Sequence, residues 1–140
     1  MLTRQGNLLL FDNGDGRAIP PLLKMPVDDC FSRVVEYRIH EPSLTVEQVW
    51  SYGRDRPDLY SPIVGDADEL PLTGNVLSVF GATSTPGAPD GPPALRGRIL
   101  ELRRTEPAGV ALDIQIGNED GASPDWTVVY RAAHVSGLGD

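Results

Sequence analysis

The sequence predicts an all-β protein that contains about two copies of one structural unit. Short runs of β-branched and aromatic residues alternate with turns along its 140 residues. Several segments of the first half return in the same order in the second half. The middle strands carry apolar side chains on both faces, which indicates sheets that are covered on both sides. These observations predict neighbouring blades of a β-propeller, each with about four antiparallel strands. A β-sandwich is the alternative, but it predicts cleaner alternation and no such repeat.

Three segments recur with a nearly constant spacing. They are Gly6-Asn7 as Gly74-Asn75 after 68 residues, RVVEYR from Arg33 as RILELR from Arg98 after 65, and Gly53 as Gly117 after 64. Matches in the same order with so little drift indicate an internal repeat. We therefore expect one repeat over about residues 1–53, a second over about residues 60–117, and a closing strand over about residues 126–135.

The first repeat opens with a turn and a short strand. Gly6 and Asn7 form the turn, and the apolar residues 8–11 form the strand. Residues 12–16 combine Asn and Asp with Gly, which accept positive φ, so they begin a loop that runs to Asp29.

A β-hairpin is predicted for the rest of the first repeat. Residues 33–39 are β-branched and aromatic, Pro42 breaks the run, and residues 45–52 form the second strand. A helix over residues 45–52 is the alternative, because Val46 and Trp50 have helical spacing. The strand is favoured because the window is short and rich in strand formers.

The second repeat is expected to begin with a strand that the first repeat lacks. Ile63 and Val64 indicate a short buried strand within residues 60–71, and residues 75–80 form the next one. Residues 81–97 hold too much Pro and Gly to pack, so we expect a flexible surface loop there.

The chain is predicted to end with a hairpin and a single strand. Residues 99–103 and 110–116 form the hairpin. A polar loop over residues 118–125 then leads to a last strand over residues 126–134.

Composition and charge exclude several classes of protein. The net charge is −8 and 40% of the residues are hydrophobic, which suits a soluble globular domain. Lys and Arg are scattered singly, which argues against nucleic-acid binding, and no apolar run is long enough to span a membrane. Residues 1–6 are too polar for a signal peptide. Cys30 is the only cysteine, so no internal disulfide is possible.

Five segments together resemble the carboxy-terminal part of the bacterial arylsulfate sulfotransferases. They are LLLFDNGDGR (8–17), SRVVEYRIHE (32–41), TVEQVWSYG (45–53), YSPIVGDADELPLTGNVL (60–77) and VYRA (129–132). The resemblance implies about two blades of a six-bladed β-propeller, in an enzyme that is often periplasmic. It also implies transfer of a sulfuryl group from an aryl sulfate to a phenol through a sulfated histidine, with no cofactor.

The resemblance further implies which parts of the active site this chain holds. The acceptor histidine precedes the segment that matches Leu2 and Thr3, so we expect it upstream of Met1 and expect this chain to be inactive alone. The innermost strands, residues 60–65 and 129–135, would face the channel and place Val64 and Tyr130 beside the aryl ring. A core valine and a core tyrosine are the alternatives for these two residues.

The expected partners are phenolic small molecules bound by the complete propeller. The uncovered blade faces predict pairing with the remaining blades of the same enzyme or self-association, and neither nucleic acid nor a membrane is expected as a partner. A non-catalytic β-rich binding module is the alternative function, because fold alone does not settle activity.

The other side chains capable of chemistry are better explained as structural or solvated. His40 and His134 stand near a turn and a chain end and are expected to be solvated. No histidine lies near Cys30 in sequence, and neighbouring carboxylates disfavour its thiolate. Three acidic residues could suggest a metal, namely Asp66, Asp68 and Glu69, but they lack the Gly and the distant Glu of a calcium loop. We therefore expect a solvated turn there and no metal site.

Overall fold

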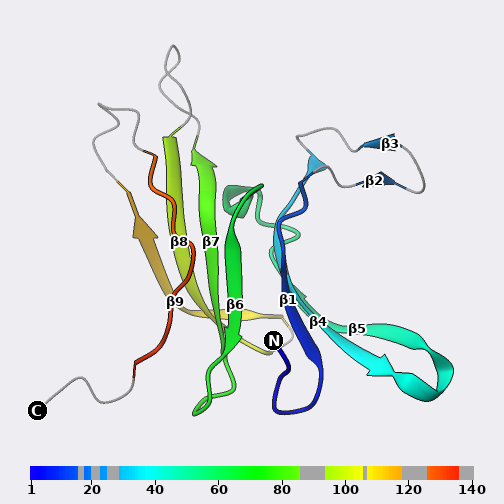
Figure 1. Cartoon of the computed structure of the whole chain (residues 1–140). Coiled ribbons are helices and arrows are strands. Elements are labelled where there is room, and N and C mark those ends of the chain that lie inside the picture. Colours follow the sequence, from blue (N-terminus) through cyan, green and yellow to red (C-terminus); the bar gives the residue numbers. More distant parts are fainter. Residues whose placement is uncertain are drawn as a thin grey trace, which may run out of the picture.

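The chain folds into two antiparallel sheets (Figure 1), as the all-β prediction requires. This computed structural model describes residues 1–15, 18–19, 23–24, 29–85, 94–105, 107–117 and 126–135. Two 3-10 turns lie wholly within these ranges, Glu41–Ser43 and Pro57–Leu59. A search of the same ranges for a helix long and apolar enough to cross a membrane finds no candidate. The two sheets are compatible with two neighbouring propeller blades.

Each sheet is formed by one half of the chain. The first, sheet I, has the order β1-β4-β5, and the second, sheet II, has the order β6-β7-β8-β9; β2 and β3 pair in a separate ribbon. The strands are β1 (Leu8–Asp12), β2 (Ala18–Ile19), β3 (Leu23–Lys24), β4 (Arg33–His40), β5 (Thr45–Tyr52), β6 (Gly65–Glu69), β7 (Val76–Thr85), β8 (Ala94–Arg103) and β9 (Gly109–Ile116).

The strand predicted over residues 45–52 is confirmed, and the helical alternative is excluded. β5 pairs with β4 from Thr45, opposite His40, to Tyr52, opposite Val34. The connecting turn places Leu44 at φ 52, so the chain reverses directly into the second strand. Cross-strand pairing therefore outweighs the helical spacing of Val46 and Trp50.

The buried strand predicted at Ile63 and Val64 is wrong in position. The strand, β6, begins at Gly65, and the side chain of Ile63 is 54% exposed. Val64 has a φ of 51, outside the extended region, so the ladder cannot include it. The apolar pair belongs to the turn that precedes the strand.

The flexible loop predicted over residues 81–97 is also too long. β7 continues to Thr85 and β8 begins at Ala94, and residues 86–93 lie outside the described part of the chain. Thr83 donates a hydrogen bond from Oγ1 to the carbonyl oxygen of Arg96, 2.8 Å away. Gly81 and Gly97 are strand residues that must be glycine because the backbone of Val129 packs on Gly81 and its side chain on Gly97, which loop composition alone cannot reveal.

The last strand predicted over residues 126–134 is not formed within the described residues. A single parallel bridge joins Trp126 to Leu95. The backbone nitrogens of Thr127 and Val129 then donate to Leu95 on β8 and Gly81 on β7. The segment therefore crosses sheet II instead of running beside one strand, and Figure 1 shows it in front of that sheet. We call residues 126–135 the crossing segment.

The internal repeat is visible as one hydrogen bond in each sheet. Asn7 donates from Nδ2 to Oε1 of Glu36 at 2.8 Å, and Asn75 donates to Oε1 of Glu101 at 2.6 Å. Gly6 and Gly74 precede the asparagines at φ 79 and 73, which a side chain would disfavour. The recurring glycine, asparagine and glutamate thus form one local structure twice.

The core lies between the two sheets. Apolar side chains of both sheets are buried there, namely Leu9, Val34, Trp50, Val76, Phe80, Leu100 and Leu102. The rings of Phe11 and Phe80 meet edge to face with centroids 5.0 Å apart. Gly65 permits this contact, because a Cβ atom at that position would overlap the ring of Phe11.

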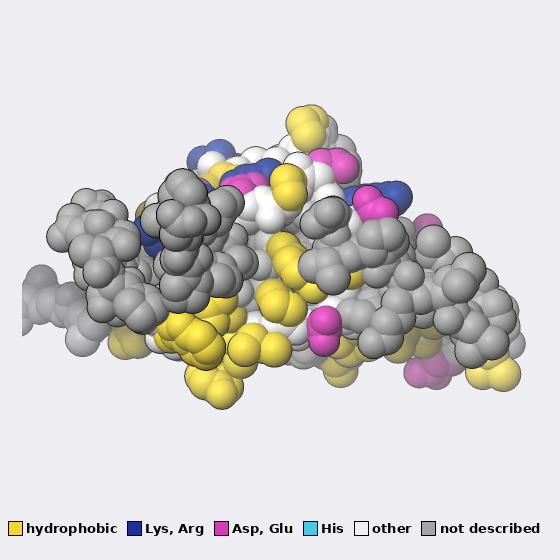
Figure 2. Space-filling model, turned by 90° about the horizontal axis from the view of Figure 1, so that it is seen from above, with side chains coloured by type: hydrophobic (Ala, Val, Ile, Leu, Met, Phe, Trp, Pro, Cys, Tyr) yellow, Lys and Arg dark blue, Asp and Glu magenta, His cyan; other side chains and the backbone are white. Residues whose placement is uncertain are grey.

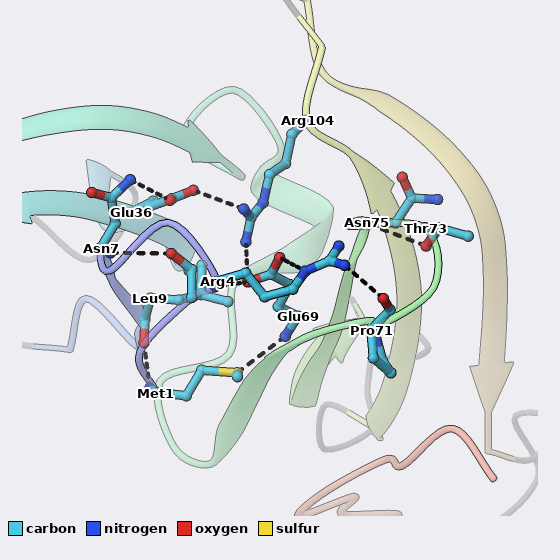
Figure 3. A network of polar contacts seen from close by, with 11 residues as sticks. Met1, Arg4, Asn7, Leu9, Glu36, Glu69, Pro71, Thr73, Asn75 and Arg104 are labelled. Carbon is cyan, nitrogen blue, oxygen red and sulfur yellow. Dashed lines mark hydrogen bonds and ion pairs between the residues drawn. The ribbon is translucent and has the colours of Figure 1, made fainter. Parts of the chain in front are cut away.

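Charged side chains connect the sheets at one end of the core (Figure 3). Arg104 of sheet II lies 3.5 Å from Glu36 of sheet I and 3.8 Å from Glu69 on β6. Arg4 donates to both carboxylate oxygens of Glu69, through its backbone nitrogen at 2.8 Å and Nε at 3.1 Å. Burial would raise the pKa of Glu69, but the hydrogen bonds from Arg4 and the charge of Arg104 outweigh it, so that pKa is lowered. The carboxylate of Glu69 is therefore ionised and paired.

Replacing Gly65 with Ala should destabilise the fold by about 1–3 kcal/mol, because the new methyl group forces the Phe11 ring out of its contact with Phe80. Urea unfolding followed by circular dichroism measures the loss. Gly109→Ala is the matched control, since its added Cβ would meet nothing closer than 3.6 Å. Equal midpoints for the two variants would contradict this packing.

The two repeated glutamates should differ in their contributions to stability. Glu36 is 2% exposed and pairs with Arg104. Glu36→Gln removes the charged partner of a buried guanidinium, so it should lower the free energy of unfolding by about 3 kcal/mol. Glu101 is partly exposed and accepts a hydrogen bond from Asn75, so Glu101→Gln should cost about 1 kcal/mol. Guanidinium unfolding of both variants checks the order, and the reverse order would refute the role of Arg104.

Candidate functional site

Val64, one of the two residues predicted to contact an aryl ring, stands at a strained turn. Its φ of 51 is unusual for a β-branched residue. Such conformations cost on the order of 1–3 kcal/mol and persist only where surrounding contacts hold them. The carbonyl oxygen of Val64 accepts hydrogen bonds from Ser61 Oγ at 3.0 Å and Asn13 Nδ2 at 3.1 Å. The turn is thus fixed by side chains from two parts of the chain.

A buried cluster of serines extends these contacts into both sheets. Ser61 and Ser32 are fully buried, and the backbone nitrogen of Ser61 donates to Oγ of Ser32 at 2.8 Å. Ser32 donates in turn to the carbonyl oxygen of Asn13 at 2.7 Å, and Ala82 of β7 donates to Oγ of Ser61 at 2.9 Å. Because these buried groups satisfy one another, the turn at Val64 is rigid.

The structure brings Val64 close to the segment that contains Tyr130, the other predicted residue. A Cβ atom at Gly81 would lie 2.8 Å from Cγ2 of Val64 and would overlap the carbonyl oxygen of Val129. Glycine at this position therefore lets the turn and the crossing segment meet. Tyr130 follows Val129 directly, and 75% of it is exposed. Tyr130 is therefore largely open to solvent.

Arg131 attaches the crossing segment to β6. Its guanidinium lies 3.2 Å from Asp66 and 3.0 Å from Asp68, and the hydrogen bond to Asp68 raises the pKa of Arg131. Both carboxylates lie on a strand, so the solvated turn expected for Asp66, Asp68 and Glu69 is wrong. Glu69 points away from these two aspartates, since it contacts Arg4 between the sheets. Among the described residues no group of three acidic, histidine or cysteine side chains could hold a metal.

A second concave region lies beside the charged junction of the sheets. It is a cavity of about 260 Å³ lined by Gln5, Asn7, Glu36, Arg38, Val49, Trp50 and Arg104. The indole nitrogen of Trp50 and Nε of Arg104 are buried and donate to no atom of the described residues. Neither nitrogen is open to the cavity, and the carboxylate of Glu36 disfavours an anion there.

The two histidines lie apart from both regions of interest on the sheets. His40 ends β4 at the hairpin turn, where its Nε2 is 3.2 Å from the carboxylate of Glu47. Its side chain is 43% exposed. His134 is exposed in the crossing segment and lines a shallow hollow beside Leu70 and Pro71. The carboxylate of Glu47 can orient the imidazole ring of His40, but Glu47 itself supplies no nucleophile.

Cys30 is buried, with 8% of the residue exposed. Burial raises the pKa of Tyr60, and the neighbouring Cys30 and Asp15 act in the same direction. Because Cys30 is buried, its thiol is shielded from solvent, which differs from the exposed and electropositive setting of reactive cysteines.

Sequence reasoning missed the side chains that support the site. Ser32, Ser61 and Asn13 are small polar residues of a kind that is common in every loop, and nothing in their spacing predicts a shared cluster. The segment over residues 60–77 that carries the family resemblance does include this turn, but a strand was predicted there. The two residues selected for an aryl contact do lie near each other, through Val129, although their exposures differ.

Comparison with known proteins identifies relatives of the whole arrangement. The sequence matches the family described as Arylsulfotransferase (ASST) over residues 1–123. It is 49% identical over 85 residues to the arylsulfate sulfotransferase AssT of Escherichia coli O6:H1, and 49% identical over 65 residues to that of Lelliottia amnigena. These alignments cover 59% and 44% of this chain, but 13% and 10% of the relatives.

The family match spans β1 to β9 and includes the charged junction, the serine cluster and the turn at Val64. It stops before the crossing segment. The chain therefore belongs to the arylsulfotransferase family.

Proposed function

We propose that this chain forms part of the channel wall of an arylsulfate sulfotransferase, which moves a sulfuryl group from an aryl sulfate to a phenol. The observation that supports this is the family match over residues 1–123. The matched residues form two consecutive sheets, and each sheet contains the same kind of Asn–Glu hydrogen bond. By family resemblance the setting is a propeller in the periplasm, and the partners are the remaining blades.

The proposed chemistry has two steps. A histidine nitrogen attacks sulfur as the bond from sulfur to the aryl oxygen breaks, and the leaving phenolate takes a proton. The oxygen of an acceptor phenol then attacks the sulfur of the sulfated histidine and loses its proton, as the bond from sulfur to the histidine nitrogen breaks and frees the histidine. Family resemblance assigns that histidine to a segment before Leu2. His40 is bound to a carboxylate at the far end of a hairpin, and His134 lies at an exposed end, so neither is our candidate for the carrier.

Within this scheme Val64 and Tyr130 contact the aromatic ring of the substrate. What supports their role is that the turn at Val64 is rigid and meets the crossing segment over Gly81, next to the exposed ring of Tyr130. An aromatic side chain and a branched aliphatic one suit an apolar aryl group. Residues 1–135 thus bind and orient the substrate, while the covalent carrier and the positive donors come from other blades.

The purified 140-residue chain should not transfer sulfate from a chromogenic aryl sulfate to phenol, because the covalent route lacks its carrier. The release of coloured phenol should match that of buffer. Transfer that is lost in His40→Ala or His134→Ala would make one of these histidines the nucleophile and refute the proposal. Phenol binding without transfer, even with the other blades added, would favour a non-catalytic binding module.

In an enzyme that contains all the blades, Tyr130→Ala should raise the KM for the phenol about tenfold, because one aromatic contact is lost. Tyr130→Phe is the matched control and should stay within about twofold of the parent, since it keeps the ring. Steady-state rates against phenol concentration provide the measurement. An equal effect of both substitutions would show that the ring of Tyr130 does not contact the substrate.

A further inference from the structure

Tyr130 stands on an exposed part of the crossing segment. The residue is 75% exposed, so its ring has little packing of its own to fix its position. Figure 2 shows hydrophobic side chains along the lower edge of that view, which corresponds to the front of Figure 1, where the crossing segment lies on sheet II. The position of the Tyr130 ring therefore depends on how the neighbouring residues attach the segment to the sheet.

Val129 attaches the segment on one side of Tyr130. Its backbone nitrogen donates to the carbonyl oxygen of Gly81 at 2.9 Å. Its side chain packs on Gly97, where an added Cβ atom would overlap Cγ2 of Val129. Among the described residues, this is the last backbone hydrogen bond from the crossing segment to sheet II. Beyond Val129 the attachment is made by side chains.

Arg131 attaches the segment on the other side of Tyr130. Its Nε lies 3.2 Å from the carboxylate of Asp66, and its Nη2 donates to that of Asp68 at 3.0 Å. Asp66 and Asp68 alternate with Ala67, which packs in the core between the sheets, so both aspartates point from the opposite face of β6. The forked guanidinium can bridge both carboxylates, which a compact ammonium group does less well.

The strand that holds Arg131 begins directly at the turn that contains Val64. Val64 precedes Gly65, the first residue of β6, and Asp66 comes next. Hydrogen bonds from the serine cluster and Asn13 fix this turn. Arg131 therefore ties the crossing segment to a strand whose start is rigid. The two residues expected to contact an aryl ring are thus connected through one short strand and one arginine.

The charges around Arg131 suit a positioning role and disfavour a contact with sulfate. Two carboxylates share its guanidinium, and the side chain of Arg131 is 68% exposed while those of Asp66 and Asp68 are each 28% exposed. The cluster therefore carries a surplus of negative charge. A sulfate group is an anion, so this surplus opposes its binding here. A neutral phenol ring meets no such penalty.

We infer that Arg131 is a positioning residue, which holds Tyr130 in place for the aromatic ring of the substrate through ion pairs with β6. This role rests on the proposed function, because it takes Tyr130 as the aryl contact. It goes further in assigning the position of that contact to the ion pairs of Arg131 with Asp66 and Asp68. Since these ion pairs are exposed, salt screens them, and the hold on Tyr130 should weaken as salt rises.

Hydrogen exchange of the Val129 amide, followed by NMR in the 140-residue chain, measures how firmly the crossing segment is attached. Arg131→Gln should speed this exchange about fivefold, because two exposed ion pairs are lost and the segment opens more often. Arg103→Gln is the matched control, since Arg103 is an exposed arginine of β8 that has no ion pair with another described residue. Its exchange should stay within about twofold of the parent.

Two further comparisons show whether the ion pairs are responsible. Asp66→Asn combined with Asp68→Asn should reproduce the faster exchange, and adding Arg131→Gln should then change nothing more. Raising the salt concentration should speed exchange in the parent but not in Arg131→Gln. The salt series on the parent needs no variant, so it is decisive even if a variant fails to fold. Unchanged exchange in Arg131→Gln, additive effects, or a parent that is insensitive to salt would overturn the inference.

Steady-state rates in an enzyme that contains all the blades separate this role from a substrate contact. Arg131→Gln should raise the KM for the phenol about fivefold and leave kcat within about twofold. In a Tyr130→Ala background it should cause no further rise, because Arg131 acts through Tyr130. A further rise in that background would show that Arg131 contacts the substrate itself and would overturn the positioning role.

The same rates distinguish a failure of this inference from a failure of the proposed function. If Tyr130→Ala raises the KM for the phenol but Arg131→Gln does not, the positioning role is refuted while the aryl contact stands. If neither substitution changes the KM, the aryl contact of Tyr130 is refuted, and the positioning role is refuted with it.

Discussion

The hydrogen bond between an asparagine after a tight glycine turn and a glutamate on the neighbouring strand fixes each sheet of this protein. A buried carboxylate is costly unless it is paired, so Glu36 needs Asn7 in one particular register. Arg104 then brings the second sheet to the same carboxylate, and Glu69 ties the first strand of that sheet to Arg4. Register within a sheet and contact between sheets therefore depend on one set of charges.

Much of the fold could be predicted from the sequence, because its periodicity is local. The strands at β4, β5, β8 and β9 follow from runs of β-branched and aromatic residues, and the repeated glutamate marks the same position in both hairpins. The errors arise where long-range contacts override composition. Gly81 and Gly97 look like loop residues, but they are strand positions over which Val129 must fit. The crossing segment has strand composition, yet it lies across a sheet and, within the described residues, forms a single β-bridge instead of a ladder.

The candidate site could be predicted only in outline. Family motifs select Val64 and Tyr130, but the conformation of the turn at Val64 depends on hydrogen bonds from the neighbouring Ser61 and from Asn13, which is 51 residues away in sequence. A valine at positive φ is disfavoured by any local rule, so only the tertiary hydrogen bonds explain it. Conflict between local preference and observed conformation is typical of functional sites, where the surroundings hold a residue in place.

The spacing of the repeat has a consequence for how such a chain can change over time. The offset falls from 68 residues at the asparagines to 65 at the glutamate motif, while the Asn–Glu bond stays the same. All of that difference lies in the connection between β1 and β4 and its counterpart between β7 and β8. Insertions and deletions have therefore accumulated there without disturbing register, as the weak dependence of loop closure on length allows. These connections are the positions at which evolution, or an engineer, can add new sequence at little cost to the sheets.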